Sequence, residues 1–309
     1  RIPRHYECEW FDFQSRKIRL ESFSSLQEKS RPGPAPRFPD PGFQIVREKD
    51  REDDEKIARF DSEHIRAARP DDEIPGGPDI GSMFHDVFEQ IDFEAVAANP
   101  DNLFESAASA DLIDSTMYAY QIDRRWRFQV GRLVARTLTT PVIAGEEQFV
   151  LGRIGKAERI HEVEFFYSFP PAAGEPLNIP DCDIAVGRRC FIRGFVDLVF
   201  RHNGKYFIAD WKSNRLDGGY GHEALKECMN TAGYHLQYKL YTIALLRWQQ
   251  YVFGERFDAQ RQFGGIFYFF LRGMGAASGD GVFFVPPAGV GPLEHLEAEI
   301  AARLFGTTA

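Results

Sequence analysis

The residues of this chain best suited to catalysis are two aspartates and a lysine in neighbouring apolar runs. Asp197 lies in the run 191–200, and Asp210 and Lys212 lie in the run 205–214. Both runs are rich in aromatic and β-branched residues and alternate as strands do. Because side chains two residues apart share a face of a strand, Lys212 is expected beside Asp210. A lysine next to paired carboxylates suits chemistry at a divalent cation.

The dipeptide Asn203-Gly204 predicts how the two runs pair. Asn-Gly between alternating apolar runs is the strongest short signal for a β-hairpin. If these two residues form the loop and neither strand is bulged, Asp197 falls directly opposite Asp210, and both carboxylates lie on one face of the sheet. Directly opposed Cβ atoms are ~5 Å apart, where like charges repel. A divalent cation is therefore expected between the carboxylates, with the backbone carbonyl of Trp211 as a further oxygen ligand.

Longer segments of the chain resemble a known family. Acid on one strand followed by acid-x-Lys on the next is similar to the core of PD-(D/E)xK nucleases. The sequence around these residues and in other segments resembles the C-terminal nuclease domain of RecB, the helicase-nuclease subunit of bacterial exodeoxyribonuclease V. A single D-x-K carries little information, but five motifs in order make a strong resemblance. They are SFSSLQ (22–27), GSMFHDVFE (81–89), GFVDLVFRHNGKYFIADWKSN (194–214), LQYKLYTIAL (236–245) and FGGIFYFFLRG (263–273).

The resemblance implies an α/β fold with a central mixed β-sheet flanked by helices, and a Mg²⁺-dependent deoxyribonuclease. Mg²⁺ activates water and stabilises the charge that develops on the phosphate. Asp197, Asp210 and the Trp211 carbonyl are the expected ligands, and Lys212 is expected to position or help deprotonate the attacking water. The alternative for Asp197 is a buried acid paired with an arginine such as Arg193, which shares its face of the strand.

His85 is a candidate metal ligand on a predicted amphipathic helix over 81–95. It lies at the edge of an apolar stripe centred on Phe84, with Glu89 one turn on. A histidine at such an edge is commonly a structural residue. In the resembled family, however, the histidine of G-x-x-x-H-x-x-F-E binds the metal. Imidazole suits Mn²⁺ better than Mg²⁺, so Mn²⁺ is also expected in the site, and Ca²⁺ can occupy it.

Three further residues are assigned to the site by the resemblance. Gln237 and Tyr241 are one helical turn apart and share a face; in the family this Q-x-x-x-Y motif lines the active site. The alternative is a buried tyrosine with a hydrogen-bonded glutamine. Glu164, in a predicted strand over 161–169, matches an acidic position of the family. It either lines the site or forms a salt bridge, and the sequence does not choose.

Five arginines crowd a predicted helix over 116–137. Arg125, Arg132 and Arg136 fall close to one face of it. A stripe facing DNA is one interpretation. A solvated helix face or a contact with a partner subunit are the more ordinary ones.

Composition limits the classes of protein. With 309 residues, 43% hydrophobic and 27% charged, the chain can bury a sizeable core. It has neither an apolar run of ~20 residues nor a signal-peptide pattern, and a cytoplasmic location is expected. The net charge of −9 counts against DNA binding by bulk attraction but leaves room for a local basic groove. Four cysteines without a C-x-x-C pair predict free thiols rather than a zinc or iron–sulfur site.

The chain is expected to divide into two parts. Residues 1–79 form an N-terminal arm with a proline-rich and charged linker, and residues 80–309 form the nuclease domain. Because the chain starts with Arg1 rather than Met, it is expected to be a piece of a longer protein. It contains no G-x-x-x-x-G-K-[ST] motif, so it cannot hydrolyse ATP through a P-loop.

The resemblance also implies partners. A helicase motor in the longer protein would deliver single strands of DNA for double-strand break processing and recombination, with RecC-like and RecD-like subunits. One alternative is an AddAB-type or stand-alone nuclease of the same fold. Another is a catalytically inactive RecC-like domain that only binds DNA or a partner. Such domains lose the acids or the lysine, and this chain keeps them.

The remaining expected elements follow from apolar periodicity. They are a helix over 233–250, strands over 263–272 and 281–285, and a final helix over 293–305.

Overall fold

The computed structural model describes residues 74–169, 182–186, 190–275 and 279–305. Most of the expected N-terminal arm, including the motif SFSSLQ, lies outside the described residues. So does the proline-rich part of the linker.

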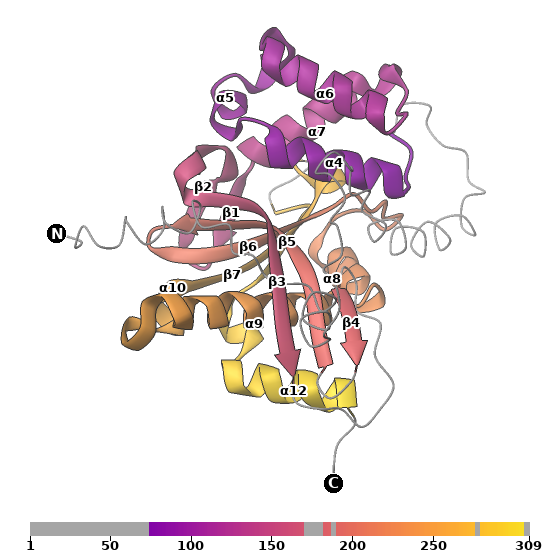
Figure 1. Ribbon diagram of the computed structural model, residues 1–309. Coiled ribbons are helices and arrows are strands. Elements are labelled where there is room, and N and C mark those ends of the chain that lie inside the picture. Colours follow the sequence, from indigo (N-terminus) through magenta and orange to yellow (C-terminus); the bar gives the residue numbers. More distant parts are fainter. Residues whose placement is uncertain (1–73, 170–181, 187–189, 276–278, 306–309) are drawn as a thin grey trace, which may run out of the picture.

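A six-stranded mixed sheet forms the centre of the fold (Figure 1). Its strands run in the order β3-β5-β6-β7-β8, and β4 also pairs with β5. β6 and β7 are parallel, whereas the other pairs are antiparallel. The predicted central mixed sheet is thus confirmed. The strands are β3 (Arg159–Phe169), β4 (Cys182–Val186), β5 (Cys190–His202), β6 (Lys205–Lys212), β7 (Phe263–Phe270) and β8 (Val282–Val285).

Helices cover both faces of the sheet and divide the apolar side chains into two cores (Figure 1). One face, here the α4 side, is covered by α4 (Pro78–Gln90), α5 (Phe93–Ala98), α6 (Ala107–Ala119) and α7 (Arg127–Thr139). The other, the α9 side, is covered by α8 (His222–Thr231), α9 (Tyr234–Phe253) and α12 (Leu293–Phe305). Two short helices are α10 (Ala259–Gln262) and α11 (Pro287–Val290). Because both faces are covered, nearly every residue of β6 and β7 is buried, as parallel strands usually are.

Two predicted helices differ from what their sequence patterns suggest. The helix predicted over 81–95 ends at Gln90, because Asp92 caps a new helix by accepting hydrogen bonds from the next backbone N–H groups. The helix predicted over 116–137 is wrong as a single element. It is broken between α6 and α7, where Gln121 has a positive φ of 56° and Asp123 caps the next turn.

The other predicted elements are present with small shifts of their ends, and the final helix matches its predicted range. One short hairpin was not predicted. It consists of β1 (Pro141–Ala144) and β2 (Glu147–Val150), which form a separate two-stranded sheet.

Candidate functional site

The predicted hairpin is confirmed over the paired part of β5 and β6. Its register runs from the loop back to Leu198↔Ala209. Asn203 and Gly204 have φ of 48° and 79°, as the favoured two-residue hairpin turn requires. The sequence therefore predicted both the loop and the register of this pair correctly.

The hairpin opens one residue before the two aspartates would meet. On this side of β5, the pairing with β4 reaches Gly194 and the pairing with β6 begins at Leu198. Residues 195–197 have no strand partner there among the described strands. The expectation that Asp197 lies directly opposite Asp210 in a regular, unbulged pair is thus wrong.

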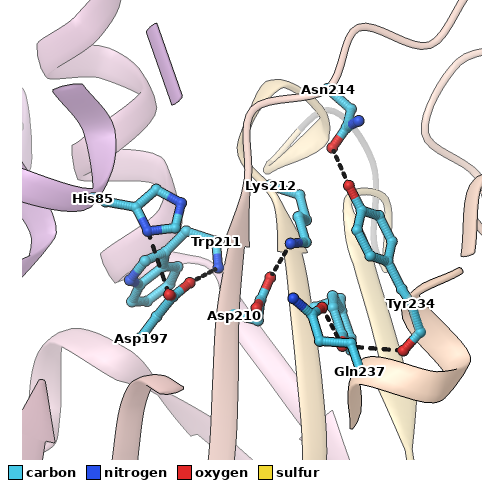
Figure 2. A network of polar contacts seen from close by, with 9 residues as sticks. His85, Asp197, Asp210, Trp211, Lys212, Asn214, Tyr234 and Gln237 are labelled. Carbon is cyan, nitrogen blue, oxygen red and sulfur yellow. Dashed lines mark hydrogen bonds and ion pairs between the residues drawn. The ribbon is translucent and has the colours of Figure 1, made fainter. Parts of the chain in front are cut away.

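The two faces of β5 show the same irregularity. Val196 and Val199 both pack in the core of the α9 side, whereas Leu198 packs in the core of the α4 side. Regular alternation would put Val196 and Leu198 on one face. The local change of face leaves Asp197 directed toward α4 (Figure 2).

Asp197 is buried and held by two partners. Its Oδ1 lies 3.3 Å from Nδ1 of His85, and its Oδ2 accepts a hydrogen bond of 2.7 Å from the backbone N–H of Trp211 (Figure 2). Burial by itself raises the pKa of the Asp197 carboxyl. The charge and hydrogen bond of His85, the charge of Lys212 and the Trp211 N–H outweigh burial and hold the pKa below its usual value.

The alternative partner for Asp197 is engaged elsewhere. Arg193 Nε lies 2.6 Å from Oε1 of Glu164, near the surface. Glu164 is therefore a salt-bridge partner, one of the two roles that the sequence left open for it.

α4 brings His85 to the sheet because its apolar stripe is anchored there. Phe84 and Phe88 are fully buried, and the Phe88 ring stacks on Trp211 with centroids 4.4 Å apart. The Trp211 ring also stacks on Phe269 at 5.4 Å, so the ring belongs to the core, as predicted. The helix thus docks against the open end of the hairpin, as a metal-binding His85 requires.

Glu162 is a site residue that the sequence analysis missed. One ligand atom from each of His85, Glu162 and Asp197 lies within 4.8 Å of the others. The β3–β5 pairing includes His161↔Leu198 and Val163↔Val196 but skips the position between them, where Glu162 has a φ of 52°. Regular alternation would place Glu162 and Glu164 on the same face of the strand. The backbone irregularity at Glu162 directs it to the cluster instead, and periodicity does not reveal that irregularity.

His161, next to Glu162, adds no positive charge near neutral pH. Burial, reinforced by the charge of Arg159, lowers the pKa of His161 to about 4 against the opposing effect of Asp197. The acids beside it therefore depend on other cations.

Asp210 and Lys212 lie together on the α9 side. Asp210 Oδ2 is 2.9 Å from Lys212 Nζ, and both residues are buried (Figure 2). The Nζ atom also lies 4.1 Å from the centroid of the Tyr234 ring. The predicted proximity of acid and lysine is confirmed. Asp210 therefore lies on the opposite side of the sheet from Asp197, so the expectation that both carboxylates share one face is wrong. Because Asp210 is not part of the cluster of His85, Glu162 and Asp197, its role as a metal ligand stays a prediction, as does that of the Trp211 carbonyl.

Gln237 and Tyr241 both lie on the inner face of α9. Gln237 is fully buried, its Oε1 accepts a hydrogen bond of 2.9 Å from the Tyr268 hydroxyl, and it lies beside Asp210 (Figure 2). Tyr241 is 1% exposed and packs edge-on against Phe165 at 5.6 Å. The hydrogen-bonded, buried arrangement matches the structural alternative, while the position of Gln237 also places it next to the site.

Arg272 connects segments that are distant in sequence. Its Nε donates to the carbonyl of Ser213 at 2.8 Å, and its two terminal nitrogens donate to the carbonyls of Ile74 and Pro75, each at 2.7 Å. Ser213 follows Lys212, and Ile74 and Pro75 precede the helix that carries His85. One side chain therefore links the segment before α4, the helix that carries His85, to the segment after Lys212.

The cluster has the donor types that a hard or borderline divalent cation takes. Carboxylate oxygens suit Mg²⁺, Mn²⁺ and Ca²⁺, and an imidazole nitrogen favours Mn²⁺ among them. The residues present therefore fit a divalent metal.

Among the described residues, no helix combines the length and the apolar character needed to cross a membrane.

Comparison with known proteins gives a consistent result. The family model described as the PD-(D/E)XK nuclease superfamily matches residues 58–303. The chain is similar to the RecBCD enzyme subunit RecB of Haemophilus influenzae, with 31% identity over 70% of this chain and 18% of the relative. RecB of Escherichia coli is 26% identical over 65% of the chain and 17% of the relative, and RecB of Mycobacterium tuberculosis is 30% identical over 66% and 21%. The chain thus spans about a fifth of the length of these relatives.

Proposed function

Because the chain belongs to the PD-(D/E)XK nuclease superfamily, we propose that it hydrolyses phosphodiester bonds of DNA with a divalent metal, as the nuclease domain of a RecB-like subunit. The observation that carries this proposal is the convergence of His85, Glu162 and Asp197 within 4.8 Å, next to the buried pair of Asp210 and Lys212.

The metal would be held on the α4 side by His85, Glu162 and Asp197. The further oxygen donors of this proposal are the Trp211 carbonyl and Asp210, whose side chain lies on the α9 side and would have to turn toward the metal. When bound, Mg²⁺ or Mn²⁺ supplies a Lewis acid for the phosphate and lowers the pKa of water. The Asp197 carboxylate suits this role because its depressed pKa keeps it ionised near neutral pH. The Trp211 N–H and His85 orient its two oxygens toward the cluster.

Lys212 and Gln237 would act on the substrate side. Lys212 is held by Asp210 and by the Tyr234 ring, so its ammonium group has a defined position. From there it would position the attacking water and offset negative charge on the phosphate. Gln237, fixed by its hydrogen bond to Tyr268, would shape the adjacent wall, with Tyr241 supporting the helix from the core.

The proposed substrate class and partners are supported by the names of the relatives. These relatives are subunits of the RecBCD enzyme, which supports an exodeoxyribonuclease of this type acting in double-strand break processing. Single strands delivered by a helicase motor, RecC-like and RecD-like partners, Mg²⁺ as the physiological metal and a cytoplasmic location belong to the same proposal. The inactive RecC-like alternative is disfavoured because the acids and the lysine are present and grouped.

The test is cleavage of labelled single-stranded DNA by the purified chain with Mg²⁺ or Mn²⁺. Asp210→Asn and Lys212→Ala should each reduce the cleavage rate by about 10²-fold or more, the usual scale for loss of a group acting on the attacking water. Glu164→Gln, which only removes a surface ion pair, serves as the matched control. Wild-type rates in a folded Lys212→Ala variant would overturn the proposal.

A further inference from the structure

One exposed face of α7 combines arginines with an aromatic ring. We call it the α7 arginine face. It consists of Phe128, Arg132 and Arg136 on α7, together with Arg125 on the 3-10 turn Arg124–Trp126 that precedes the helix. Phe128, Arg132 and Arg136 are spaced four residues apart and therefore share one side of α7. Arg125 and Phe128 are 69% and 70% exposed, and Arg132 and Arg136 are exposed as well. The Phe128 ring packs edge-to-face with Phe104, with centroids 5.5 Å apart, and the rest of the ring is open to solvent.

The charges of this face are largely uncompensated. The chain has a net charge of −9, yet residues 127–139 contain no acid. Arg132 and Arg136 have no ion-pair partner in the described part of the chain, and Arg125 is 3.6 Å from Asp123. By contrast Arg127 is held by Asp114 at 2.5 Å, and its guanidinium lies over the Phe104 ring. The face is thus a local positive strip on an acidic molecule.

The strip ends near the candidate site. The stem of Arg136 lies against Gly275, where an added Cβ would meet Arg136 Cδ at 3.5 Å. Gly275 lies three residues after Arg272, whose guanidinium binds the carbonyl of Ser213, next to Lys212. The α7 arginine face therefore ends, at Arg136, beside the end of the sheet that carries Asp210 and Lys212.

We propose that the α7 arginine face is a track for single-stranded nucleic acid leading to the site. This inference rests on the proposed function. Spaced guanidinium groups match the repeated phosphates of one strand. An exposed ring between them can stack on a base only when that base is unpaired, so single strands fit the face better than duplex.

Binding of oligothymidylate measured by fluorescence anisotropy without metal tests the track directly. Arg132→Gln/Arg136→Gln should weaken binding of a strand of about 20 nucleotides by about tenfold and lower the slope of log K against log salt by about 1.4, or about 0.7 per lost phosphate contact. Phe128→Ala should weaken binding by about tenfold through lost stacking. Arg261→Gln is the control, because Arg261 is 87% exposed on α10, away from α7.

Cleavage with metal separates this inference from the proposed function. In the arginine variants, KM for the long strand should rise by about tenfold, whereas kcat and the cleavage of strands of about four nucleotides should not change. Reduced binding in variants of a chain that never cuts DNA would support the track and reject the nuclease. Unchanged affinity and salt slope in folded variants would overturn the track and point to a protein partner on α7.

Discussion

The two sides of the candidate site are built in different ways. On the α4 side, His85, Glu162 and Asp197 meet where the pairing of β5 with its neighbours is interrupted and where Glu162 has a positive φ. On the α9 side, Asp210 and Lys212 lie on a regular strand that is buried on both faces.

The difference shows what each task requires. To place a lysine beside an acid, a regular strand is enough, because residues two apart lie on the same face. Ligands from three segments must converge on one point, and a regular ladder would send at least one of them elsewhere. Irregular backbone of this kind is often found at functional sites. The predictions below test whether the two sides also differ in function.

The largest contrast is expected between His85→Ala and Gln237→Ala. Loss of His85 removes a ligand from the α4 side, so Mn²⁺ affinity should fall by about 10²-fold and cleavage should require correspondingly more metal. Gln237 lies on the α9 side, so its variant should slow cleavage at saturating metal and leave the metal affinity unchanged. Isothermal titration calorimetry with Mn²⁺ measures both. Equal metal affinities of the two variants would remove the distinction between the sides.

A matched pair of glutamates on β3 should sharpen the assignment of the α4 side. Glu162→Gln should lower metal affinity by about tenfold, because it removes a charged ligand while preserving shape. Glu164→Gln should leave metal affinity unchanged and cost at most ~1 kcal/mol of stability, as expected for a surface ion pair with Arg193. Metal titration and chemical denaturation of both variants give the comparison. If Glu164→Gln proves the more damaging to metal binding, the cluster is misassigned.

Arg272→Lys tests whether the two sides are held together. Lysine keeps the charge but cannot present the three donors that reach Ser213, Ile74 and Pro75. We expect a loss of ~1–3 kcal/mol of stability from unsatisfied carbonyls. Metal affinity and cleavage rate should also fall severalfold, because the approaches to His85 and Lys212 are no longer joined.

The control for Arg272 is Arg201→Lys, which alters a bidentate contact with Glu158 far from Lys212. It should affect stability alone. Metal affinity unchanged in Arg272→Lys would restrict Arg272 to an ordinary structural role.

The smallest effect on stability is expected at Glu147, which belongs to neither side of the candidate site. Its hydrogen bond to Asn203 lowers the pKa of the carboxyl most, and Lys205 adds to this against the opposing effect of burial. Because the folded pKa lies below the unfolded value, the carboxylate stabilises the fold above pH ~4.5, and this contribution is lost as the pH falls further. Glu147→Gln should remove at most ~1 kcal/mol at pH 7 and reduce the acid dependence of unfolding. A change in metal affinity would contradict the separation of this residue from the site.

Local periodicity was enough to predict much of the fold. The Asn203-Gly204 loop defines the register of the hairpin, and the same-face position of Asp210 and Lys212 follows from strand geometry. The apolar stripe around Phe84 likewise predicted the amphipathic helix that carries His85. The predicted helix over 116–137 failed because the break at Gln121 depends on a left-handed backbone conformation that apolar spacing does not encode.

The sequence by itself therefore determined which strands pair around Asp197 and Asp210 and which face carries Lys212, because these follow from contacts between near neighbours in the chain. Only the tertiary structure decided that pairing stops before Asp197, that Glu162 rather than Glu164 joins His85, and that Arg272 binds carbonyls almost two hundred residues away. Those outcomes depend on how distant elements pack against one another, and no periodicity within a single element contains that information.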